Sequence, residues 1–165
     1  MRVRPLIAGV LAAGAILWLP AGSPAKVSHA GWPPRTGDLI MHKQDQSGVI
    51  RGGSAGHNEL LGGHGDDTIY AGPNGDVIWG DYKPCCQPTT QVDHLYGGPG
   101  NDFIYASHGT NYIYTGGGVD VVHAHFGHGE IHCQSDTVTV FLTRKSRHRY
   151  KLFGCNHLSY AHTLD

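Results

Sequence analysis

The stretch Gly62–Tyr70 (GGHGDDTIY) matches every fixed position of the nine-residue pattern G-G-x-G-x-D-x-U-x, in which U is a large aliphatic residue. Gly97–Tyr105 (GGPGNDFIY) is a second full match, and imperfect copies fill the chain between and beyond the two in the same phase. A fixed period of nine residues indicates a repeat fold in which each unit supplies one short strand and one turn.

The eighth residue of each copy is aliphatic. Side chains alternate between the two faces of a strand, so these residues point inward and their neighbours point outward. The aliphatic positions are Leu60, Ile69, Ile78, Leu95, Ile104, Ile113, Val122 and Ile131. We therefore predict an all-β fold over residues 49–141, a right-handed parallel β-roll (β-solenoid) of about four coils, with two units to a coil and alternate units in the same sheet.

The sixth residue of the repeat carries its chemistry. Five copies have an acid there: Asp67, Asp76, Asp93, Asp102 and Asp120. Glycines let backbone carbonyl oxygens point into the gap between successive turns, into which each carboxylate also projects. Calcium accepts many oxygen ligands in irregular geometry, whereas magnesium requires a small octahedron and keeps its waters. The spacing predicts Ca²⁺ between stacked turns, first on the edge of Asp76, Asp102 and Asp120, and then on that of Asp67 and Asp93.

An alternative interpretation is a solenoid that binds no ion, in which the aspartates cap their own turns through backbone hydrogen bonds. The degenerate copies favour this alternative, because Asn58, Asn111 and Gly129 replace the acid. The two full copies favour a cation. So does the charge of residues 52–141, which hold ten acidic residues and a single lysine, Lys83.

Residues 49–132 resemble the hemolysin-type calcium-binding repeats of the repeats-in-toxin (RTX) family. The resemblance implies calcium at Asp67, Asp76, Asp93, Asp102 and Asp120, with backbone oxygens from turn glycines such as Gly63, Gly65, Gly98 and Gly100. The chain departs from well-known members because it has an amino-terminal signal and no large toxin or protease domain, so toxicity is not carried over. The region around Cys133 and Cys155 also resembles small exported actinobacterial proteins of this kind.

The first 30 residues differ from the rest. A basic start, an apolar run from Leu6 to Leu19 and a small-x-small site at residues 28–30 predict a signal peptide, since the run is shorter than the ~20 residues that a membrane anchor needs. Cleavage of the signal peptide removes three positively charged residues and changes the net charge from −1 to −4. We expect a secreted, extracellular protein with no transmembrane anchor after cleavage. Residues 31–48 would form an irregular cap, residues 82–91 an inserted loop, and residues 142–165 a basic tail.

Four cysteines in an exported chain indicate disulfides. Cys133 and Cys155 flank the tail and are the preferred pair, which would close the carboxyl end of the roll. Cys85 and Cys86 are adjacent in the inserted loop, where a bridge between them, pairing elsewhere and a reduced state all stay open.

No catalytic constellation emerges, and we expect a protein that is not an enzyme. The string Gly52–Gly56 (GGSAG) matches the G-x-S-x-G elbow of serine hydrolases, but the helix and large α/β sheet that would make Ser54 a nucleophile are not predicted. The histidines His123, His125, His128 and His132 suggest a transition-metal site. However, His123 and His132 belong to opposite sheets in the repeat phase, so convergence on one ion is not expected.

Aromatic residues recur at outward positions. Trp79, Phe103 and Tyr105 would face outward on one sheet, and several tyrosines on the other. Such ladders stiffen a sheet by cross-strand packing, or they form a contact face for a cell-surface glycan or protein. The predicted function is calcium binding by a secreted, non-enzymatic protein with no nucleic-acid partner. The alternative is an adhesion module in which calcium is only structural.

Overall fold

The structure is a computed structural model that describes residues 32–82 and 88–161 of the 165-residue chain. Within these ranges the regular structure is almost entirely β, in short strands joined by turns. The strands are β1 (Leu39–Met41), β2 (Gly48–Arg51), β3 (Glu59–Leu61), β4 (Asp67–Tyr70), β5 (Val77–Trp79), β6 (Val92–Tyr96), β7 (Phe103–Tyr105), β8 (Thr110–Tyr114), β9 (Val121–Ala124), β10 (His128–His132), β11 (Thr139–Leu142), β12 (Tyr150–Phe153) and β13 (His157–Ser159), with one 3₁₀ turn, η1 (Ser146–His148).

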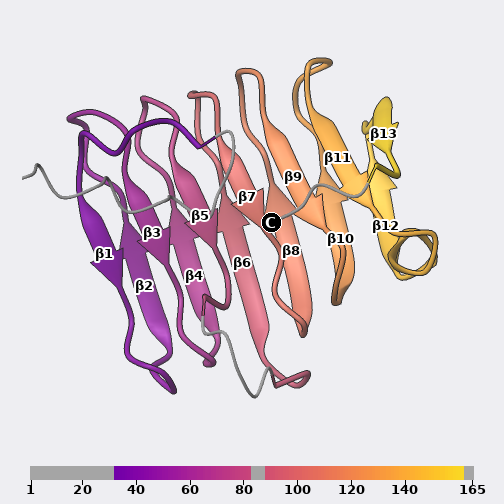
Figure 1. Cartoon of the computed structure of the whole chain (residues 1–165), viewed down its shortest axis with the longest axis horizontal. Helices are drawn as coiled ribbons and strands as arrows, with labels where there is room; N and C mark the ends of the chain where they lie inside the picture. The colour runs from indigo at the N-terminus through magenta and orange to yellow at the C-terminus, as the bar shows by residue number, and fades with distance from the viewer. Residues whose placement is uncertain (1–31, 83–87, 162–165) are drawn as a thin grey trace, which may run out of the picture.

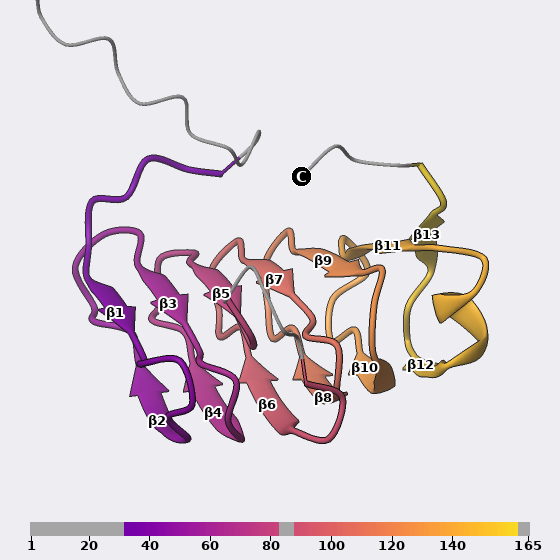
Figure 2. The ribbon, with the colours of Figure 1, turned by 60° about the horizontal axis from the view of Figure 1, so that its bottom comes forward.

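Consecutive strands of the repeat region alternate between two parallel sheets. The odd-numbered strands β1 to β11, with β13, form a seven-stranded sheet, and the even-numbered strands β2 to β12 form a six-stranded sheet. Figure 1 shows the strands side by side along the long axis, and Figure 2 shows the two sheets as separate layers joined by turns. The chain is therefore a parallel β-solenoid, as the nine-residue period predicts.

The register aligns the repeats in the way that the sequence phase requires. In the odd sheet Leu60 pairs with Ile78 and Ile78 with Ile104, and in the even sheet Ile69 pairs with Leu95. The inserted segment after Asp81 does not interrupt the stack, because β4 pairs directly with β6 across it. An excursion from a turn leaves the ladder hydrogen bonds of the neighbouring strands intact.

The core is a narrow column of aliphatic side chains between the two sheets. All eight residues predicted to point inward have an exposed fraction of 0 %. Each such side chain contributes about 1.5–3 kcal/mol by leaving water. The column continues through Ile50 at one end and Val140 and Leu142 at the other.

The coil number was predicted too low. About four coils follow from the repeats alone, whereas the strands stack into about six turns. The additional turns come from flanking segments without the nonapeptide pattern, because an edge of paired backbone accepts any extended segment with an inward apolar residue. Residues 39–41 add β1 to the odd sheet, and β12 and β13 complete the two sheets at the other end.

The carboxyl end is closed covalently. A disulfide joins Cys133, directly after β10, to Cys155, two residues after the end of β12. Within the segment predicted as a basic tail, residues 150–153 form β12, which pairs with β10. In the chain-entropy account a bridge that closes a loop of this size adds about 3 kcal/mol of stability.

Two sequence predictions lie outside the described residues: the signal peptide of residues 1–30, and the state of Cys85 and Cys86. In the ranges that the structure covers, none of the helices has the length and apolar character needed to cross a membrane.

Candidate metal centre

The turns stack along two edges of the roll, and their sixth residues form one column on each edge. The column on the odd edge consists of Asn58, Asp76, Asp102 and Asp120, and the column on the even edge consists of Asp67, Asp93 and Asn111. All these side chains are buried, with exposed fractions of 1 % or less. The fold thus brings the five predicted aspartates into two columns of neighbours.

Each column is held together by a repeated hydrogen bond. The backbone N–H of a sixth residue donates to Oδ1 of the sixth side chain in the next coil. On the odd edge Asp76 donates to Asp102 (2.6 Å) and Asp102 to Asp120 (2.9 Å), and on the even edge Asp67 donates to Asp93 (3.1 Å). One oxygen of each acceptor is therefore already engaged by the fold.

The second oxygen separates the aspartates into two groups. In Asp67 and Asp76 it accepts the N–H of the second turn residue, from Gly63 (2.8 Å) and Gly72 respectively. Oδ1 of Asp67 is also contacted by Nδ1 of the buried His42 at 2.7 Å, and Oδ1 of Asp76 accepts from Nδ2 of Asn58 at 2.8 Å. These two carboxylates are completed by protein donors.

Asp93, Asp102 and Asp120 form the other group. Among the described residues, none donates a hydrogen bond to Oδ2 of any of the three, although all three atoms are buried. At the second position of the Asp102 and Asp120 turns, Gly98 and Gly116 have φ of +95° and +82°. Gly116 donates its N–H to Oε1 of Gln134 (3.0 Å) rather than to Asp120. In these two turns, where the second residue has a left-handed backbone, its N–H does not donate to the aspartate, and the carboxylate oxygen has no donor.

The carboxyl groups of this second group titrate abnormally. Burial raises the pKa of Asp102 to about 8, and the neighbouring charges of Asp120 and Asp76 add to the effect. Burial also raises the pKa of Asp93 to about 7 and that of Asp120 to about 6. Without a cation, holding these groups ionised is costly, because a buried charge needs a compensating partner.

Glycine at the first position of a turn leaves room beside Oδ2 of the sixth-position aspartate. A Cβ on Gly97 would overlap the carbonyl oxygen of Thr115 in the next coil and would lie 2.8 Å from Oδ2 of Asp102. A Cβ on Gly80 would likewise lie 2.8 Å from Oδ2 of Asp93. The space beside Oδ2 of Asp93 and of Asp102 is open only because the facing residue is glycine, and a backbone carbonyl borders it at Asp102. The turn of Asp120 begins with Thr115 instead.

The four glycines predicted as backbone ligands lie in two different surroundings. A Cβ on Gly63 would meet the carbonyls of Lys43, Gln44 and Gln46, and one on Gly65 would meet Ser47, all from the segment before β2. Gly98 and Gly100 instead face repeat turns on both sides, and the carbonyl of Gly98 accepts the N–H of Gly117 (2.7 Å).

At its last position the even column ends in Asn111, whose side chain is hydrogen-bonded to neutral groups. Oδ1 of Asn111 accepts from the backbone N–H and hydroxyl of Ser107 at 2.9 and 3.0 Å. In the next coil Gly129 has no side chain, and the hydroxyl of the buried Tyr150 lies 3.3 Å from Nδ2 of Asn111 and donates to the carbonyl of Phe126 (2.8 Å). Asn111 and Tyr150 close the column with neutral groups, and the sequence does not reveal the role of Tyr150.

The donors present fit one kind of ion. In the described part of the chain, no three His, Cys, Asp or Glu side chains come together as a metal-binding group. A cation beside Asp93, Asp102 or Asp120 would therefore complete its shell with backbone carbonyl oxygens and water. An all-oxygen, irregular shell suits calcium and does not suit ions that prefer imidazole or thiolate.

The fold and these columns define a solenoid with oxygen donors along its turn edges. Residues 52–81 and 89–122 match the RTX calcium-binding nonapeptide repeat in four copies. The chain thus contains RTX calcium-binding nonapeptide repeats between residues 52 and 122, and Ca²⁺ is the ion that such repeats bind. No curated protein and no solved structure matched the chain.

The outward aromatic residues stack on one another. In the even sheet Tyr70, Tyr96 and Tyr114 are parallel at 4.7 and 5.1 Å, and the stack continues through His132 to Phe153. The neighbouring rings occupy each ring face, so mainly ring edges are left for solvent. Such stacks contribute about 0.5–1.5 kcal/mol per pair beyond area burial, which favours stiffening of the sheet.

The predicted contact face of Trp79, Phe103 and Tyr105 is largely covered. Tyr105 has an exposed fraction of only 5 %, because the indole of Trp32 lies against it and donates to its hydroxyl at 2.7 Å. Tyr105 therefore points outward from its sheet, but Trp32 covers it and little of it is left for a contact face. Trp79 stacks on Tyr105 and meets Trp32 edge to face, while Phe103 lies in another column, between Val77 and Val121.

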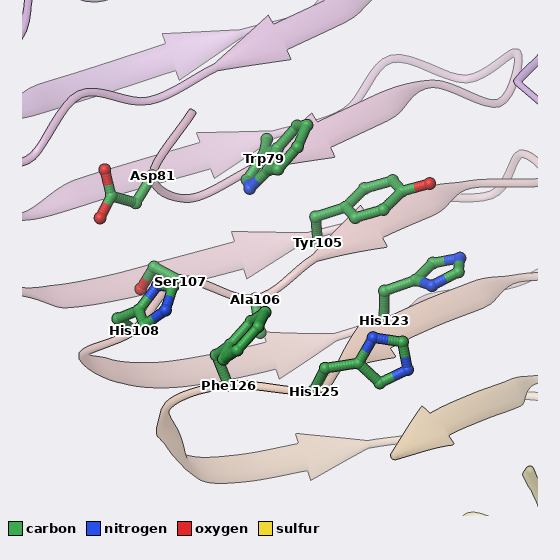
Figure 3. A pocket seen from close by; sticks show the side chains of 9 residues that line it. All are labelled: Trp79, Asp81, Tyr105, Ala106, Ser107, His108, His123, His125 and Phe126. Atoms are coloured by element: carbon green, nitrogen blue, oxygen red, sulfur yellow. The ribbon is translucent and has the colours of Figure 1, made fainter. Parts of the chain in front are cut away.

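A small pocket of about 90 Å³ lies beside this aromatic group. Figure 3 shows His108, His123 and His125 around it together with Asp81 and Phe126. His123 lies in β9 and His132 in β10, on opposite sheets as predicted, and His128 is the first residue of β10. The histidines thus do not assemble into a metal-binding group within the described residues.

Proposed function

We propose that this protein is an exported, non-enzymatic calcium-binding protein in which Ca²⁺ binds beside Asp93, Asp102 and Asp120 and stabilises the roll. The observation that carries the proposal is the buried Oδ2 of these three aspartates, which no described residue supplies with a donor. A buried acceptor without a partner destabilises a protein by about 1–3 kcal/mol, and more when it is charged. Calcium at this position removes that cost.

The chemistry of binding follows from the state of the carboxyl groups. In the absence of metal, the raised pKa values keep Asp102 largely protonated and Asp93 about half protonated at pH 7, whereas Asp120 holds its proton only below about pH 6. Calcium competes with those protons, and the affinity therefore increases with pH. We expect a dissociation constant of about 10⁻⁴ to 10⁻³ M, as in other extracellular modules.

Export is supported by the signal-like residues 1–30 and by the Cys133–Cys155 disulfide, which is typical of an oxidising compartment. A structural rather than catalytic role is supported by the surroundings of Ser54. This residue lies in an exposed turn that leads into β3, and its carbonyl accepts from Asn74 at 2.6 Å. A nucleophile elbow requires a helix at this point.

The proposal is tested by circular dichroism and thermal melting of the purified protein in calcium, in magnesium and after chelation. Calcium at a hundredfold excess over its dissociation constant should add about 2.7 kcal/mol per site to the free energy of unfolding, whereas magnesium should add little. An identical spectrum and melting temperature in all three conditions would refute the proposal.

A further inference from the structure

The carboxyl end of the roll carries a cleft with basic walls. Arg144, Arg147, His148 and Tyr160 line a hollow of about 420 Å³. A second hollow, of about 280 Å³, shares Arg144 and Tyr160 with the first and extends toward His125. The larger hollow falls within the range of about 300–1,000 Å³ that is typical of sites for small ligands.

Within residues 32–82 and 88–161, no carboxylate neutralises the positive charge of this cleft. The ion pair that the structure places on the segment 144–151 joins Lys151 to Glu130 at 3.2 Å, and Lys151 does not line the cleft. Among the described residues, no carboxylate lies within 4.0 Å of Arg144 or Arg147. Two guanidinium groups thus line one hollow without a counter-charge, and an anion bound there would be attracted by both.

The segment that presents these cations is well ordered by its own hydrogen bonds. Thr143 and Ser146 bond reciprocally, with the N–H of Thr143 donating to the Ser146 hydroxyl and the N–H of Ser146 donating to the Thr143 hydroxyl, both at 2.9 Å. The N–H of Arg147 donates to the carbonyl of Thr143 at 3.0 Å, and Tyr150 then enters β12. A preorganised loop loses little entropy when a ligand binds.

We propose that this cleft, defined by Arg144, Arg147, His148 and Tyr160, binds a uronic-acid unit of an acidic glycan. Guanidinium groups bind carboxylates through paired hydrogen bonds. Tyr160 is 53 % exposed between the two hollows, where an aromatic side chain provides an apolar surface and a hydroxyl for a sugar.

The distribution of charge favours a short contact at this end of the molecule. Residues 52–141 hold a single lysine and no arginine, so a long polyanion finds few cations along the sides of the roll. Nucleic acid is disfavoured, because single strands are bound along extended basic grooves with several aromatic platforms, whereas this cleft has one exposed tyrosine.

The test is a calorimetric titration of the purified protein, in calcium, with a hyaluronate decasaccharide and with a neutral chitin oligosaccharide of the same length. Arg144→Gln/Arg147→Gln should weaken hyaluronate binding about tenfold or more, since each hydrogen bond to a charged group contributes strongly. The matched control Lys145→Gln/Arg149→Gln removes the same charge from residues outside the cleft and should retain most of the affinity. Calcium-dependent circular dichroism of both variants verifies that they fold.

Equal weakening in the two variants would overturn the proposal, because it would mean diffuse attraction rather than a site. Absence of hyaluronate binding would overturn it, as would equal binding of the neutral oligosaccharide. Binding only to vesicles of phosphatidylcholine and phosphatidylserine in equal parts would also overturn the proposal, as would binding only to single-stranded DNA.

Discussion

Asp67 and Asp102 occupy the same position in the two full nonapeptides, yet the protein completes one carboxylate and leaves the other open. Asp67 accepts from Gly63 and contacts His42, whereas no described residue donates to Oδ2 of Asp102. The turn of Asp67 stacks on a non-repeat segment, while the turn of Asp102 has repeat turns on both sides. The motif supplies the carboxylate, and the neighbouring coils decide whether an oxygen is left for a cation.

The strongest test of this contrast closes the space beside Asp102. Gly97→Ala places a Cβ against the Thr115 carbonyl and Oδ2 of Asp102. Because both neighbours are fixed in the stack, we expect a loss of about 3 kcal/mol in the free energy of unfolding, together with loss of calcium-dependent stabilisation. Urea unfolding with and without calcium measures both.

Gly117→Ala is the matched control for that substitution. The nearest atoms to a Cβ there belong to Pro99, at 3.8 and 3.9 Å. This variant should lie within about 0.5 kcal/mol of the wild type and keep its response to calcium. Similar losses in the two variants would show that the turn resists any side chain, and the specific role of the space beside Asp102 would be rejected.

A second test removes one donor from a completed carboxylate. His42→Ala removes the imidazole that lies 2.7 Å from Oδ1 of Asp67. In chelator this should cost about 2 kcal/mol, because a buried charged acceptor loses a partner. The N–H groups of Gly48 (3.1 Å) and Gly63 (2.8 Å) still donate to the two oxygens of Asp67, so calcium should not recover the loss, whereas His42→Gln should recover part of it. Recovery of the loss by calcium would contradict the distinction between completed and open carboxylates.

A third and smaller effect is the pH dependence of the calcium-free protein. The pKa of Asp102 is raised to about 8, above the value of about 3.9 in the unfolded chain. Between these values the folded state keeps a proton that the unfolded state releases, so stability is fully present below about pH 4 and decreases as pH rises toward 8. The slope is at most about 1.4 kcal/mol per pH unit for each such group.

Urea unfolding of calcium-stripped protein across this range measures the slope, and Asp102→Asn should reduce it. A stability that rises between pH 5 and about 8 in the stripped protein would contradict the assignment of protonated carboxyls.

Much of the fold follows from the repeat itself. The eight aliphatic positions alternate with outward residues at a fixed period, and all eight are buried because one inward residue per unit must fill one narrow column. The same period fixes which aspartates become neighbours, since pairing of Ile78 with Ile104 places Asp76 beside Asp102.

What the sequence did not reveal depends on segments without the repeat. Trp32 covers Tyr105, and His42 completes Asp67, from residues 31–48, for which only an irregular cap was predicted. The φ angles of the second turn residues were also hidden, because glycine occupies that position in both full copies and adopts either hand readily. The choice between them is made by the adjacent coil.

The most direct test of the central claim is a calorimetric titration of calcium into two double variants. Asp102→Asn/Asp120→Asn removes charge where the carboxylate oxygens are open, and Asp67→Asn/Asp76→Asn removes it where protein donors complete them. The account predicts that the first variant loses the heat of calcium binding beside Asp102 and Asp120 and keeps only the part that comes from Asp93, whereas the second variant keeps the full heat. Calcium binding that survives in the first variant and disappears in the second would contradict it.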